Sequence, residues 1–169
     1  MIGPVELIVA AFQGEDKAGE VLDTLKQLEK EEIIFLVNAA VMTKDKKGKV
    51  SIKETQDVGA GKGALFGAIA GGLVGLLGGP VGVVVGAAAG AATGGVAASK
   101  IDMGFPDDTL KELQGSLTDG SSAILALIQH EWVDRVVEEL EKHEAALFRQ
   151  ALKEELVTQL NEEEEESSE

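Results

Sequence analysis

"VELIVAAFQGEDKAGEVLDTLKQLEKEEIIFLVNAAVM", from Val5 to Met42, holds two apolar runs on either side of a charged segment. The first run is rich in branched residues and has the length of a strand. The second, from Ile33, is nearly continuous in apolar residues, as in a strand buried on both faces. Between them, apolar residues recur at helical spacing, at Ala18, Val21, Leu22, Leu25 and Leu28. The stretch therefore predicts a strand–helix–strand unit.

A hairpin is predicted directly after this unit. "TKDKKGK" reads as a turn, in which Gly48 can take a positive φ. "VSIKET", from Val50, then alternates apolar and polar residues as a hairpin strand would. The N-terminal part thus reads strand, helix, strand, strand.

The C-terminal part repeats the strand–helix–strand order. "SSAILALI", from Ser121, predicts a strand, "HEWVDRVVEELEKH" a helix, "AALFRQAL", from Ala145, a second strand, and "KEELVTQL" a short terminal helix. Before this unit, "FPDDTLKELQGSLTDG" predicts a short helix that starts at Pro106 and Asp107 and is weakened or ended by Gly115. Two such units sharing one sheet predict an α+β fold, a ferredoxin-like sandwich with helices on one face.

Composition narrows the classes of function. The 169 residues suit one domain, and the 30 acids against 15 bases give a formal charge of −15. Such a charge argues against nucleic acid as a partner, because phosphate contacts need clustered bases. Cysteine is absent, which excludes disulfides and thiolate metal sites and fits a reducing compartment. No basic region followed by an apolar run marks a secretory signal at the N-terminus.

An uncharged, glycine-rich stretch of 37 residues lies between Lys62 and Lys100. Many of its glycines keep a four-residue interval, which places them along a stripe of a helix where another helix backbone can approach closely. The proposed helix-packing and oligomerisation residues are Gly63, Gly67, Gly71, Gly75, Gly82, Gly86, Gly90 and Gly94. The hairpin turn is predicted at Gly78, Gly79 and Pro80, between helical arms over Ala60–Leu77 and Val81–Ser99.

This glycine-zipper hairpin needs a packing partner. Each Gly costs a helix about 0.5–1 kcal/mol relative to Ala, so the arms are unstable alone in water. Lipid is one candidate partner, with Lys62 and Lys100 as interface anchors on the same side of the membrane. The second arm has five Val and no Leu, Ile or Phe, which makes it a poor spanning segment by itself. Burial in the core of a homo-oligomer is the alternative.

Several of these segments together resemble a known family. They are "VELIVAAF", "KDKKGKVSIKET", "DVGAGKGALFGAIAGGLVGLLGGPVG" and "FPDDTLKELQGSLTDGSSAILALI". In this order they resemble domain-of-unknown-function family 1269, over nearly the whole chain to about Leu160. The resemblance implies a bacterial protein with a ferredoxin-like fold, a glycine-zipper insertion and stress-linked or membrane-linked roles. It implies no reaction and no catalytic residues.

No catalytic, cofactor or metal site is predicted. "DVGAGKGAL" has Gln56 and Gly63 where a phosphate loop needs a glycine and a hydroxyl residue. His130 and His143 are 13 residues apart, unlike helical metal pairs, and suit cap or dipole roles. Trp132 is predicted to pack between helix and sheet. The remaining carboxylates fit solvated helix faces.

The sequence thus divides into four parts. Residues 1–58 form the first unit and its hairpin strand, 59–100 the glycine-zipper insertion, 101–160 the second unit, and 161–169, "NEEEEESSE", an acidic disordered tail. We expect a non-enzymatic, self-assembling protein held at the cytoplasmic side of a membrane by its hairpin. The alternatives are a soluble cytoplasmic homo-oligomeric scaffold or stress protein, and a small-molecule sensor.

Overall fold

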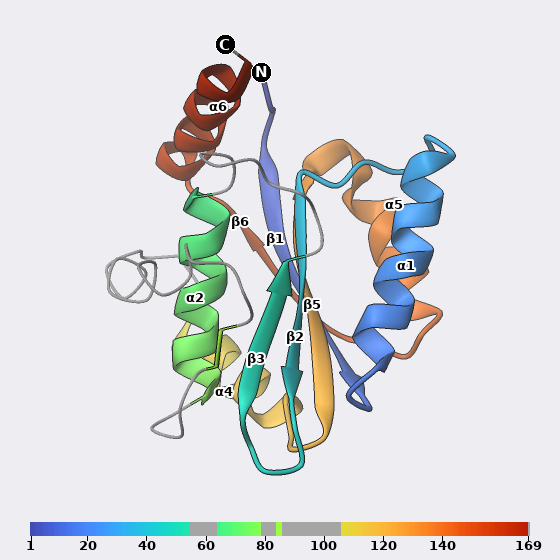
Figure 1. Ribbon diagram of the computed structural model, residues 1–169. Helices are drawn as coiled ribbons and strands as arrows, with labels where there is room; N and C mark the ends of the chain where they lie inside the picture. The colour runs from blue at the N-terminus through green and yellow to red at the C-terminus, as the bar shows by residue number, and fades with distance from the viewer. Residues whose placement is uncertain (55–63, 79–83, 86–105, 169) are drawn as a thin grey trace.

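The computed structural model describes residues 1–54, 64–78, 84–85 and 106–168. Its strands are β1 (Val5–Gln13), β2 (Asn38–Lys44), β3 (Val50–Glu54), β4 (Val84–Val85), β5 (Ser121–Gln129) and β6 (Ala146–Ala151). Its helices are α1 (Lys17–Lys30), α2 (Ala64–Gly78), α4 (Asp107–Ser116), α5 (His130–Glu141) and α6 (Glu154–Ser168) (Figure 1).

The strands form one open sheet in the order β4-β3-β2-β5-β1-β6. Neighbouring strands pair antiparallel throughout the series β3-β2-β5-β1-β6. β4 contributes two residues, which pair parallel to β3. β5 lies between β1 and β2, and β1 lies between β5 and β6. The two strand–helix–strand units, β1-α1-β2 and β5-α5-β6, therefore interleave in one sheet. The α+β class predicted from the sequence is confirmed.

Helices cover both faces of the sheet, so the prediction of helices on one face is wrong. α1 and α5 pack on the face that carries Ile8, Ala10 and Phe12 of β1, whereas α2, α4 and α6 pack on the opposite face (Figure 1). The physical reason lies in the central strands. Eight consecutive residues are buried in each of β1 and β5, and an apolar sheet buried on both faces needs cover on both.

Two predicted elements differ from the structure, one in its start and one in its type. β2 begins at Asn38 rather than Ile33, because the chain crosses from the end of α1 to the sheet over Ile33–Val37. In this crossing the Glu29 carboxylate accepts a hydrogen bond from the Leu36 N–H, 3.0 Å away. α4 ends at Ser116, one residue after Gly115, near which the sequence predicts its end. Val84 and Val85, predicted within the second helical arm, instead pair with Ser51 and Ile52 as a strand, which suits β-branched residues.

The acidic segment from Asn161 is helical rather than disordered as far as Ser168. α6 begins before this segment and buries Leu156 and Leu160 in the same core as β1 and β5. Asn161 is itself tied down, because its side-chain amide accepts from the Ile2 N–H and donates to the Ile2 carbonyl at 3.2 Å. This packing fixes the first turns of α6, and the acidic run continues the same helix.

Candidate functional site

α2 divides cleanly into a large apolar face and a small apolar face. The residues buried on the sheet side include all of its large side chains up to Val74, at Leu65, Phe66, Ile69, Leu73 and Val74. The outer residues are half-buried or exposed, and they are Ala64, Ala68, Gly71, Gly72 and Gly75. These five fall at intervals of four, three, one and three residues, which is one helical face. A surface helix normally carries polar residues there, and α2 has none.

The face of α2 that carries the large side chains packs against the sheet of its own chain. Phe66 is 2% exposed and Ile69 and Leu73 are fully buried, in a cluster that also contains Leu7 and Val9 of β1. Each such side chain contributes about 1.5–3 kcal/mol through burial, which offsets the low helix propensity of the glycines. α2 is therefore part of the fold, and Gly71, Gly72 and Gly75 face away from the large residues.

The acidic helix α6 supplies a cap at the N-terminus of α2. The first turn of α2 contains no acidic residue. Instead, the Leu65 N–H donates a hydrogen bond of 2.9 Å to Oε1 of Glu163, 98 residues further along the chain. A carboxylate at this position satisfies one unpaired N–H and interacts favourably with the helix dipole. The sequence around α2 does not indicate this contact, because Glu163 is remote from α2 in the chain.

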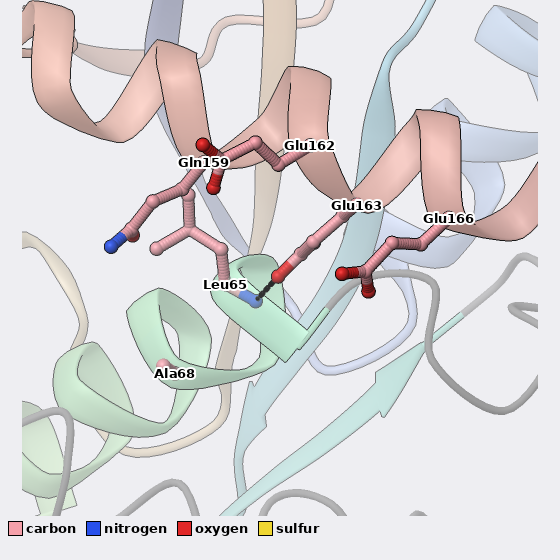
Figure 2. Close-up of a pocket in the computed structure, with 6 residues that line it drawn as sticks. All are labelled: Leu65, Ala68, Gln159, Glu162, Glu163 and Glu166. Atoms are coloured by element: carbon pink, nitrogen blue, oxygen red, sulfur yellow. Dashed lines mark hydrogen bonds between the residues drawn. The ribbon is translucent and has the colours of Figure 1, made fainter.

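A pocket of about 320 Å³ lies between the two helices (Figure 2). Leu65 and Ala68 form its α2 wall, and its α6 wall is formed by Gln159, Glu162, Glu163 and Glu166. In Figure 2 the Glu163 side chain points to the start of α2, beside Glu162 and Glu166. The pocket is thus walled by three carboxylates, of which one is engaged with the α2 backbone.

A polar cluster at one end of β1 was not predicted from the sequence. Glu6 has a side chain only 11% exposed, and its carboxylate lies 3.0 Å from Nδ1 of His130. The Arg149 Nε donates to the other oxygen of Glu6 at 3.0 Å. The cluster joins β1, α5 and β6. Because all three side chains are occupied with one another, it acts as a structural tie between these elements.

The second histidine, His143, lies just after the C-terminal end of α5 and contacts a residue of that helix. His143 Nε2 lies 3.5 Å from Oε1 of Glu139, and Lys142 Nζ lies 2.9 Å from the other oxygen. The hydrogen bond from Lys142 is the main reason that the pKa of Glu139 is lowered.

Trp132 is partly buried and packs, as predicted, against the core that lies between the sheet and the helices α1 and α5. Within the described residues, no group of three or more His, Cys, Asp and Glu side chains could hold a metal ion.

One protein-family model, described as protein of unknown function (DUF1269), matches residues 58–164. The chain belongs to the DUF1269 family. The match covers most of the chain from the start of the glycine-rich stretch into the acidic run of α6. No match was found among the curated proteins or among the solved structures.

In this DUF1269 protein, the described part of the chain contains some of the predicted packing glycines. Gly67 is buried in α2, Gly71 is half-buried and Gly75 is exposed, with open space where a Cβ would lie. Gly78, predicted in the hairpin turn, is the last residue of α2. The other predicted residues lie outside the described residues, namely Lys62, Gly63, Gly79, Pro80, Gly82, Gly86, Gly90, Gly94 and Lys100.

The length and polarity of the helices bear on the membrane prediction. Among the helices that the structure of this DUF1269 chain describes, none combines the length and the apolar character that crossing a bilayer requires.

Proposed function

We propose that this DUF1269 protein is a non-enzymatic, self-associating module, in which a ferredoxin-like domain presents the outer face of α2 to a second copy. The observation that carries the proposal is the make-up of that face, which consists only of alanine and glycine. Small residues let two helix backbones approach closely, and two copies of one face can pair about a two-fold axis. The interleaved order of the two strand–helix–strand units supports the ferredoxin-like assignment.

The proposal is tested by placing a long polar side chain on the outer face. Gly75→Gln adds a side chain where nothing lies within 4 Å, so the monomer should gain about 0.5–1 kcal/mol of helix propensity. The same side chain should prevent close approach of a second α2 and shift the protein towards monomer. The measurement is sedimentation velocity across a concentration series, with urea unfolding in parallel.

Gly115→Gln on α4 is the matched control. Gly115 is also an exposed helical glycine with open space where a Cβ would lie, so its replacement should raise helix propensity equally. We expect it to leave the association unchanged. If both variants associate like the wild type, the outer face of α2 is not the contact surface.

A second candidate function is attachment to the cytoplasmic side of a membrane through the segment between Lys62 and Lys100. Its support is the 37-residue stretch without a charge. Detergent-free fractionation separates the two candidates. Sedimentation with membranes and release only by detergent would favour lipid attachment, whereas recovery as one defined oligomer in the supernatant would favour assembly in water.

A further inference from the structure

The turn between β2 and β3 forms a basic tip on a strongly acidic protein. It carries Lys44, Lys46, Lys47 and Lys49, within a chain whose formal charge is −15. Lys46, Lys47 and Lys49 are exposed, and within the described residues none of the three forms an ion pair. Lys44 Nζ lies 3.9 Å from Oδ1 of Asp119. The tip therefore presents at least three cations to solvent.

The backbone of this basic tip is held in one conformation. Oδ1 of Asp45 accepts from the N–H groups of Lys47 and Lys49 at 2.8 and 2.9 Å, and Gly48 takes the φ of +81° that the turn requires. The Gly120 N–H donates to the Lys44 carbonyl at 2.8 Å, which ties the tip to the start of β5. The one aspartate in the turn thus serves the backbone, and the lysines are displayed on a rigid support.

The opposite pole of the molecule carries the complementary charge. Glu162–Glu166 are five consecutive acids in the second half of α6, and the last turn of this helix has no basic residue. Like charges three and four residues apart repel, and negative charge is unfavourable at a helix C-terminus. Cations from outside this helix would therefore interact favourably with its acidic end.

The two surfaces lie at opposite ends of the sheet. In Figure 1 the β2–β3 turn is at the bottom, and the end of α6 lies at the top beside both termini. β1 runs between these ends with nine residues, or about 30 Å at 3.3 Å per residue. This separation is larger than the screening length of about 8 Å at physiological salt, and too large for the tip to reach the acidic end of its own chain.

We propose that the basic tip of one copy binds the acidic end of α6 of a second copy, head to tail. Because one copy then keeps its acidic end and the other keeps its tip for a further neighbour, the contact builds rows or closed rings rather than only dimers. The chain itself supplies the matching acidic surface, whereas an anionic membrane or nucleic acid would repel most of this acidic molecule. The contact uses residues other than the outer face of α2, so it stands independently of the function proposed above.

The decisive experiment is a charge exchange between the two surfaces. In the tip variant, Lys46→Glu and Lys47→Glu make the tip acidic; in the end variant, Glu162→Lys, Glu165→Lys and Glu166→Lys make the run of five acids in α6 net basic. Each variant alone should associate at least about tenfold more weakly than the wild type at low salt. An equimolar mixture of the two should regain association, and so should a chain that carries all five substitutions. Sedimentation velocity at about 20 mM and about 500 mM NaCl measures each state, and wild-type association should fall at the higher salt.

A control variant distinguishes this contact from a general effect of net charge. Lys26→Glu with Lys30→Glu on α1 changes the net charge as the tip variant does, and should associate as the wild type does. Circular dichroism establishes that every variant is folded. A monomeric wild type at low salt would overturn the proposal, as would a five-substitution chain that fails to associate. Tip-dependent binding to phosphatidylglycerol vesicles without self-association would also overturn it, in favour of lipid as the partner.

Discussion

At the scale of single residues, Glu163 links the two ends of the family-matched region by accepting the Leu65 N–H. Glu163→Ala leaves this N–H of the first turn without its carboxylate, so we expect a loss of about 0.5–2 kcal/mol, as for other helix caps. The loss is measured from the urea midpoint at constant slope. Glu163→Gln keeps an oxygen acceptor and should lose less.

Glu166→Ala provides the control for this substitution. It removes the same charge from the same pocket wall, but no hydrogen bond joins Glu166 to the backbone of α2 within the described residues. Its effect should stay within about 0.5 kcal/mol, as for ordinary surface positions. Equal losses for the two variants would mean that general charge, and not the cap, accounts for the effect.

At the scale of elements, α6 holds α2 on the sheet through both its apolar and its acidic halves. A chain ending at Lys153 loses the burial of Leu156 and Leu160, about 3–6 kcal/mol at about 1.5–3 kcal/mol for each leucine. A chain ending at Asn161 keeps these leucines and loses the Glu163 cap together with the like-charge repulsion, so its stability should change little. Hydrogen exchange should show α2 amides exposed in the shorter chain and protected in the longer one. Equal protection of α2 in both chains would contradict this role of α6.

The elements that could be predicted from the sequence are those set by local periodicity. The helical spacing in α1 and α5 and the apolar runs of β1 and β5 led to the right elements, within a few residues at their ends. The end of the chain could not be predicted in this way. Five adjacent glutamates suggest a solvated coil, and they are helical because Leu156, Leu160 and Asn161 anchor the preceding turns.

At the scale of the whole molecule, the continuous apolar runs of the central strands indicate that helices cover both faces of the sheet. β1 buries Leu7 and Val9 on one face and Ile8 and Ala10 on the other. A sheet covered on one side would leave half of these residues in water, and the glycine-rich region supplies α2 as part of the missing cover. The contacts of Glu6 and Glu163 depend on residues more than 90 positions away, and no local pattern could have indicated them.

The net charge of the whole molecule sets how its stability responds to salt. With 30 acids and 15 bases, the folded chain repels itself at neutral pH, and screening reduces this repulsion. The melting temperature should therefore rise between about 20 mM and about 500 mM NaCl, and a gain of about 1 kcal/mol would appear as about 2–4 °C. Self-association through opposite charges should weaken over the same range. Calorimetry at low protein concentration measures the melting temperature, and sedimentation at higher concentration measures the self-association. A melting temperature that falls with salt would mean that native ion pairs, such as Glu6 with Arg149, outweigh the net repulsion.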